Sequence, residues 1–248
     1  MKRIAVLFAL PIEAKPFLKH ITDLRMDLES QTRYTGFIDG KAISVRVSGI
    51  GRERAGRAAQ LCLDKDNPSA ILAAGFAGGL LAQLTPGSIS VSQSLFCFDR
   101  AGEHIYRSDK RLLEHAGTLR DLGSVHFGPT ITADKIIASP QEKKALFSSK
   151  EYVSVDMESA AIADVAENGD VPFIAIRSIT DAVDDLLPIP IIQNMDPDGR
   201  INLKGLAGAF IRQPALVVDA YRMMSKARLA SANLALFLKS FIEKLSFE

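Results

Sequence analysis

The chain has 248 residues, of which 47% are hydrophobic and 24% are charged, and its 30 lysines and arginines outnumber its 29 aspartates and glutamates by one. Because the net charge is so small and the basic residues are scattered, the sequence predicts no basic surface that would attract nucleic acid. We therefore expect no nucleic-acid partner. No apolar stretch reaches the roughly 20 residues needed to cross a bilayer, so we expect no membrane span.

The chain contains no linker rich in Pro, Gly or Ser, no charge block and no internal repeat. We therefore expect a single domain over residues 1–248. The apolar run near the N-terminus is too short for a signal peptide and is interpreted as a buried first strand. Cys62 and Cys97 lie in apolar surroundings and have no partner at metal-ligand spacing, which predicts reduced core cysteines, no metal site and a cytoplasmic location.

Predicted strands and helices alternate along the chain. Strands are expected at 3–9, 43–49, 70–78, 88–95, 125–134, 152–155 and 171–179, and helices at 53–64, 109–123, 139–149, 156–169 and 203–245. The last helix is broken near Pro214, Asp39 and Gly40 supply the turn of an early hairpin, and Ser139 caps the helix that Pro140 opens. This order indicates an α/β layer fold on a mostly parallel or mixed sheet.

Acidic side chains follow the ends of several predicted strands. These acids are Glu13, Asp134, Asp156, Glu158 and Asp181. Because ligands of α/β folds gather at the carboxyl ends of strands, we expect a site at this edge. Glycine-rich runs at 48–56 and 74–80 also follow strands and bring backbone without side chains to the same edge.

Six segments also resemble a known family. They are LPIEA (10–14), SGIGRERAGRAA (48–59), GFAGGL followed by PGSISVS (75–92), TADKIIAS (132–139), VDMESAAIADVA (155–166) and VPFIAIRSITDAVD (171–184). They occur in the order seen in the purine nucleoside phosphorylase and nucleosidase superfamily, and are most similar to methylthioadenosine/S-adenosylhomocysteine nucleosidases. The resemblance implies a three-layer α/β fold with a mixed central sheet flanked by helices. We also expect a homo-oligomer, with a dimer favoured.

The resemblance implies a role for each matching residue. Asp181 would hydrogen-bond to or protonate N7 of the purine, Glu158 would hold the ribose hydroxyls, and Glu13 would orient the attacking water. Met157 would pack against the sugar. The other residues expected to bind the nucleoside are Asp156, Ile136, Ile137, Phe76, Gly78 and Ile50.

The chemistry of the reaction agrees with these roles. Breaking an N-ribosidic bond leaves positive charge on the sugar and negative charge on the base, so it needs an acid beside the base and negative groups near the sugar. Desolvation by the apolar strand before Asp181 would favour its protonated form. Glu158, in the first turn of the predicted helix, is expected to stay ionised and accept two hydroxyls. No cofactor is required.

Each residue also has an ordinary structural interpretation. Taken alone, Asp156 and Glu158 could complement a helix dipole, Asp181 could cap the next segment, and Ile136 and Ile137 could be core residues. These alternatives weaken together, because independent placement would not put every acid after a strand in the family's order.

The chain departs from the phosphorylases of the superfamily at their phosphate site. Ala73 and Phe76 stand where those enzymes have an arginine and a serine, so phosphate would lose a cation and a hydroxyl donor. We therefore expect hydrolysis of an adenosine derivative. Phosphorolysis stays open, with Arg200 or Arg212 as possible phosphate ligands, and so does a nucleoside-binding protein without turnover. A dinucleotide-binding oxidoreductase does not fit, because GFAGGL is not the G-x-G-x-x-G fingerprint.

Residues 186–214 form an insertion-like segment that typical methylthioadenosine nucleosidases lack. The segment resembles the hopanoid-associated phosphorylase branch, which implies an adenosylated hopanoid with a large apolar group on the ribose 5′ side. A structural loop or an oligomer contact is an equal alternative.

Overall fold

The computed structural model describes residues 2–27, 32–200 and 202–246. In these ranges the strands are β1 (Arg3–Phe8), β2 (Thr22–Met26), β3 (Arg33–Ile38), β4 (Lys41–Val47), β5 (Ala70–Gly79), β6 (Ile89–Asp99), β7 (Gly102–Arg107), β8 (Val125–Thr132), β9 (Ser154–Asp156) and β10 (Phe173–Asp181). The α-helices are α1 (Pro11–Leu18), α2 (Arg52–Asp66), α3 (Lys110–Gly117), α4 (Pro140–Lys150), α5 (Ser159–Asn168), α6 (Ile189–Gln193), α7 (Leu203–Arg212) and α8 (Leu216–Lys244).

The strands form one mixed sheet that partly closes on itself. Their order is β10-β6-β8-β9-β5-β1-β4-β3-β2, and β10 also pairs with β5. The strand β10 is parallel to β5 and antiparallel to β6, so β5, β10, β6, β8 and β9 make a closed ring. Twist accumulates along the long strands β5 and β6, which turns the sheet back on itself. The mixed central sheet is confirmed, and its closure is an added feature.

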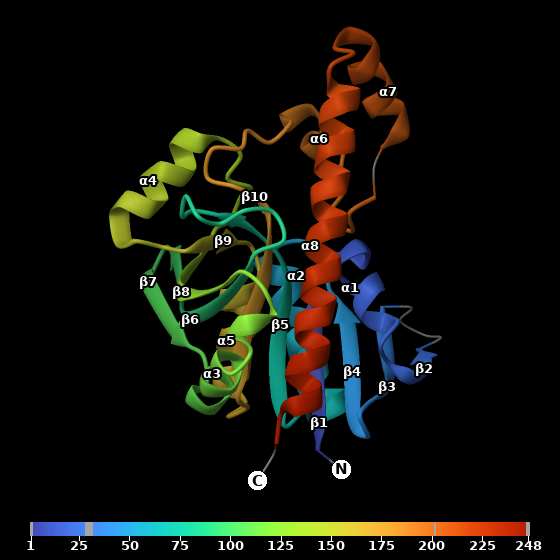
Figure 1. The fold of residues 1–248 in the computed structure, drawn as a ribbon, viewed down its shortest axis with the longest axis vertical. Helices are drawn as coiled ribbons and strands as arrows, with labels where there is room; N and C mark the ends of the chain where they lie inside the picture. Colours follow the sequence, from blue (N-terminus) through green and yellow to red (C-terminus); the bar gives the residue numbers. More distant parts are fainter. Residues whose placement is uncertain (1, 28–31, 201, 247–248) are drawn as a thin grey trace.

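Helices cover both faces of the sheet, and β1 illustrates how the sequence directs this. Ile4 and Val6 belong to a core that includes residues of α1 and α8, whereas Ala5 and Leu7 belong to a second core with α2 and α5. Alternate side chains of a strand point to opposite faces, so the continuous apolar run of β1 is buried on both sides. Figure 1 shows α8 and α1 together on one side of the sheet.

Several local predictions are confirmed. Asp39 and Gly40, with φ of 48° and 72°, join β3 to β4 in the expected hairpin. The Ser139 hydroxyl accepts a hydrogen bond from Glu142 at the start of α4, and Pro140 is its first residue. The chain also breaks between α7 and α8 beside Pro214.

Other elements were missed or misplaced. The strand β2 was not predicted because all its side chains are exposed and give no alternating pattern. The helix expected at 109–123 ends at Gly117 and is followed by a 3-10 helix at Arg120–Leu122. The helix expected at 156–169 begins three residues later, at Ser159.

The segment 186–214 folds into α6 and α7 and packs on the start of α8. Ile191, Leu206 and Leu216 form a small core between these helices. In Figure 1 the three elements stand above the sheet, and α8 continues down from them along its face. The segment therefore lies near the end of the sheet where β1, β5 and β10 finish.

Candidate active site

A cavity of about 900 Å³ lies at the carboxyl ends of β1, β5, β9 and β10. It is lined by every residue predicted to bind or transform the nucleoside: Asp181, Glu13, Glu158, Met157, Asp156, Ile136, Ile137, Phe76, Gly78 and Ile50. The remaining strand-end acid, Asp134, is exposed and pairs with Arg52 at 2.6 Å. The strand-end rule thus brings four of the five acids to one cavity, while their individual roles stay predictions.

Glu13 lies in the first turn of α1, where three backbone N–H groups donate to its carboxylate. Its Oε2 accepts from Ala9 at 2.9 Å and from Leu10 at 2.8 Å, and its Oε1 accepts from Phe76 at 2.8 Å. Burial raises the pKa of Glu13 above its usual value, while these N–H groups and the charge of Arg177 oppose the shift. A buried carboxylate with a raised pKa is suited to accept a proton from water.

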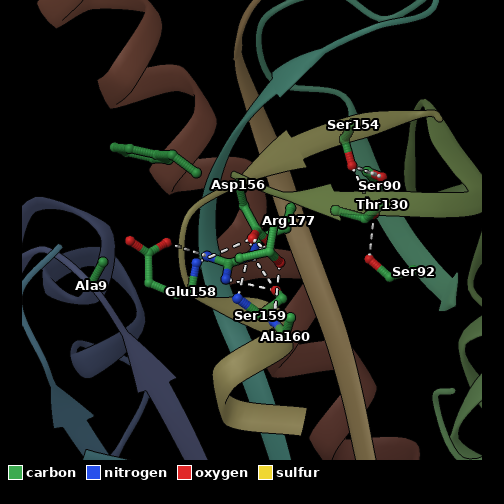
Figure 2. A network of polar contacts seen from close by, with 12 residues as sticks. Ala9, Ser90, Ser92, Thr130, Ser154, Asp156, Glu158, Ser159, Ala160 and Arg177 are labelled. Atoms are coloured by element: carbon green, nitrogen blue, oxygen red, sulfur yellow. Dashed lines mark hydrogen bonds and ion pairs between the residues drawn. The ribbon is translucent and has the colours of Figure 1, made fainter. Parts of the chain in front are cut away.

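Arg177 is a buried cation between the acids. Its Nε lies 3.0 Å from Asp156 Oδ2, and its Nη1 lies 3.7 Å from Glu158 Oε2 (Figure 2). Its Nε and Nη2 also donate to the Ser159 hydroxyl at 3.1 and 2.7 Å. Because a buried charge is stable only when it is paired, Arg177 ties β10 to β9 and to the start of α5.

Two glycines of β5 allow charged side chains to approach the backbone closely. A Cβ atom at Gly75, whose φ is +155°, would lie 2.6 Å from Arg177 Nη1 and 3.0 Å from Glu13 Oε1. A Cβ atom at Gly78 would lie 3.1 Å from Asp181 Oδ2. The glycine-rich second half of β5 therefore makes room for these charged side chains.

Asp156 ends β9 and holds the turn into α5. Its Oδ1 accepts hydrogen bonds from the Thr132 hydroxyl at 2.8 Å and from the N–H groups of Glu158 and Ser159, both at 3.2 Å. Its other oxygen faces Arg177. These contacts stabilise the position of Glu158, whereas contact between Asp156 and a nucleoside stays a prediction.

Glu158 occupies the N-cap position of α5, just before the first helical turn in which it was expected. Burial raises its pKa to about 7; the charge of Arg177 opposes this shift, and that of Asp156 adds to it. Its Oε1 accepts a hydrogen bond from Gly51 at 2.9 Å. A carboxyl group that titrates near neutrality can both accept and donate hydrogen bonds to sugar hydroxyls.

Asp181 is the last residue of β10 and is buried. A register shift just before it, where Asp181 pairs with Gly78, sets the direction of its side chain. Its Oδ1 accepts a hydrogen bond from the Thr180 hydroxyl at 2.7 Å. Lys143 of α4 places Nζ 2.5 Å from its Oδ2 as an ion pair. The apolar strand that leads to Asp181 is present, as expected. The ammonium group of Lys143 beside Asp181 was not predicted.

Sequence reasoning missed several residues of this region. Arg177 was detectable, because it is a lone charged residue in the apolar strand that leads to Asp181. Lys143 gave no signal, since it stands in a charged run that looks exposed. The apolar side of the cavity was also missed; it includes Leu187, Ile192, Met195, Met223 and Met224.

A family model described as the phosphorylase superfamily matches residues 3–212. The chain belongs to the phosphorylase superfamily. The resemblance found in the sequence motifs is thereby confirmed, whereas the likeness of residues 186–214 to the hopanoid-associated branch stays a prediction.

Two similar relatives are bacterial nucleosidases. A 5′-methylthioadenosine/S-adenosylhomocysteine nucleosidase of Maridesulfovibrio salexigens is 33% identical over 169 residues, which are 61% of this chain and 73% of the relative. The enzyme of the same name from Shewanella loihica is 29% identical over 197 residues, which are 71% and 86% of the two chains.

Two solved structures have the same fold as this chain. The nucleosidase of Neisseria meningitidis in complex with methylthio-immucillin-A matches with a TM-score of 0.78 at 19% identity, over 99% of this chain and all of the other. Futalosine hydrolase of Helicobacter pylori also matches with a TM-score of 0.78 at 19% identity, over 98% of each chain.

Among the described residues, no group of three or more His, Cys, Asp and Glu side chains is placed to hold a metal ion. Within the same ranges no helix is long and apolar enough to cross a bilayer. Cys62 and Cys97 are buried, as predicted, and both are free cysteines.

Proposed function

We propose that this protein is an enzyme that hydrolyses the N-ribosidic bond of an adenosine derivative. The observation that carries the proposal is the meeting of Glu13, Glu158 and Asp181 around the same cavity of about 900 Å³. The nucleosidase relatives support the choice of reaction.

In the proposed mechanism the base lies beside Asp181 and against Ile136 and Ile137. Asp181 donates a proton to N7, so the base leaves as a neutral molecule rather than an anion. The sugar develops positive charge as the bond breaks, and Glu158 binds its hydroxyls from nearby. Glu13 orients water toward the anomeric carbon and accepts its proton.

The surroundings of Glu13 support water as the nucleophile. Ala73 is wholly buried and has no polar side-chain atom, and Phe76 offers its N–H to Glu13 rather than a hydroxyl to an anion. A phosphate ion placed near Glu13 would be repelled by its carboxylate, which is itself buried. Water carries no charge and meets no such penalty.

Phosphorolysis is the second candidate, because Arg200 lines the cavity and could bind an anion. Arg200 itself is exposed, and a solvated arginine gives a weaker anion site than a buried one. We therefore place hydrolysis first.

The apolar side of the cavity favours a substrate with an apolar group on the ribose 5′ side. Pockets for drug-sized ligands measure roughly 300–1,000 Å³, so about 900 Å³ would leave adenosine alone with much empty space. Ile192 and Met195 of the 186–214 segment and Met223 and Met224 of α8 line this space. An adenosylated hopanoid, with its large apolar group, fits this chemistry.

Adenine release from a panel of nucleosides tests the proposal. Adenosine, methylthioadenosine and analogues with longer apolar 5′ groups should release free adenine, and Asp181→Asn should release almost none. A protein that binds these nucleosides and releases no base would contradict the proposal.

A further inference from the structure

Lys143 is a buried cation, and the described hydrogen bonds and ion pair of its side chain all go to the end of β10 and the turn after it. Its Nζ donates to the backbone carbonyls of Ala182 at 2.7 Å and Asp185 at 3.3 Å, and lies 2.5 Å from Asp181 Oδ2. The side chain of Lys143 is 0% exposed. Its neighbour Lys144 is 61% exposed and pairs with Asp184 on the surface.

The burial of Lys143 needs an explanation, because removing an ammonium ion from water is costly. Two backbone carbonyls accept hydrogen bonds from the ammonium group, and the Asp181 carboxylate lies beside it as an ion pair, which together offset that cost. All three groups belong to residues 181–185, the stretch that begins with Asp181. An alkyl side chain would fill the same space without the cost, so the charge itself has a use at this position.

We infer that Lys143 is a positioning residue for the protonation of the leaving base. The inference rests on the proposed function, in which the Asp181 O–H bond breaks, an N7–H bond forms, and the electron pair of the C–N bond goes to the base. Asp181 is then left as a buried carboxylate. The ammonium of Lys143 faces one oxygen and stabilises that developing charge, while the Thr180 hydroxyl holds the other.

The simpler role for Lys143 is a structural link between α4 and the turn at 182–185. The two roles differ in their dependence on the leaving group. A structural link matters equally for every substrate, whereas help for Asp181 matters only when the leaving group must be protonated. 4-Nitrophenyl riboside releases 4-nitrophenolate, a stable anion that needs no proton.

Lys143→Met tests the inference in the full-length protein, with adenosine and 4-nitrophenyl riboside as the two substrates. We expect kcat/KM for adenosine to fall about 10²-fold, the usual effect of losing one group that stabilises developing charge. The value for 4-nitrophenyl riboside should stay unchanged. Lys144→Met, the matched surface control, should change neither. Because both rates come from the same sample, partial unfolding lowers them together and leaves their ratio unchanged.

Two further variants keep the test decisive. Lys143→Arg retains a charge and should recover part of the adenosine rate, whereas Lys143→Gln retains polarity alone and should behave like Lys143→Met. In an Asp181→Asn background, Lys143→Met should cause no additional loss, since the two residues act as a unit.

The inference would be overturned if Lys143→Met lowered kcat/KM equally for both substrates, or if its effect and that of Asp181→Asn were fully additive in the double variant. Either result would leave the proposed function intact. A wild-type protein that cleaves neither substrate would overturn the proposed function and this inference with it.

Discussion

At the scale of single residues, Arg177 is the cation shared by three acids of the cavity: Asp156, Glu158 and Glu13. It forms ion pairs with Asp156 and Glu158, and its charge also acts on the pKa of Glu13. Asp181 pairs with a separate cation, Lys143 of α4. The acids proposed to serve the sugar and the base are therefore paired with two different cations.

Asp181→Asn is expected to lower the rate of adenine release by about 10² to 10⁴-fold, because the amide cannot act as an acid toward N7. Steady-state kinetics with adenosine measures the effect. Asp184→Asn is the matched control, since Asp184 is exposed and pairs only with Lys144 in the described contacts. Near wild-type turnover of Asp181→Asn would remove Asp181 from the mechanism.

The pKa of Glu158 makes stability depend on pH. It is about 7 in the folded protein, against an ordinary value of 4.5. The folded protein thus keeps a proton that the unfolded chain releases, and this proton stabilises the folded state. The stabilisation is full below about pH 4.5 and is lost as the pH rises to about 7. With about 1.4 kcal/mol for each pKa unit, the loss is on the order of 3 kcal/mol.

Glu158→Gln cannot ionise and should not show this loss. Between pH 5 and pH 8, its Tm is expected to fall several degrees less than that of the wild-type protein. Thermal unfolding followed by circular dichroism at both pH values measures the difference. Parallel changes in Tm for the two proteins would show that Glu158 ionises normally in the folded state.

At the scale of elements, α6, the turn after it and the start of α8 build the apolar side of the cavity. Ile192 and Met195 come from the 186–214 segment. Methionine side chains are flexible and adapt to irregular apolar groups. This element is therefore expected to select the 5′ substituent without taking part in bond cleavage.

Met195→Ser tests that division of roles. Loss of one apolar contact is worth about 1.5 kcal/mol or more, so kcat/KM for nucleosides with long apolar 5′ groups should fall about tenfold. The value for adenosine should change little. Met26→Ser is the control, because Met26 lies on β2 and is 47% exposed. If adenosine and the apolar nucleosides lose activity equally, Met195 does not determine the 5′ specificity.

Across the whole molecule, the closed ring of β5, β10, β6, β8 and β9 fixes the relative positions of the acids. The strand β10 is held by β5 on one side and by β6 on the other, so Asp181 projects from a strand without a free edge. Asp156 ends β9 in the same ring, while Glu13 follows β1 next to it. A rigid frame of this kind holds reacting groups within the small tolerances that catalysis requires.

Features that depend on local pattern were predictable from the sequence. The apolar run of β1 and the position of Asp181 after an apolar strand followed from periodicity and the strand-end rule. Features that depend on distant contacts were not. The pairing of β10 with β6 joins segments far apart in the chain, and the burial of Lys143 depends on carbonyls of residues 182 and 185. The N-cap position of Glu158 also escaped prediction, because Asp156 and Thr132 set where α5 begins.

The identity of the sugar product tests the central claim most directly. Wild-type protein is incubated with adenosine, with and without inorganic phosphate, and the products are followed by ¹H and ³¹P NMR. Hydrolysis predicts adenine and free ribose at the same rate in both samples, with no new phosphate ester. Adenine release only in the sample with phosphate, together with ribose 1-phosphate, would contradict the account of Glu13 and water.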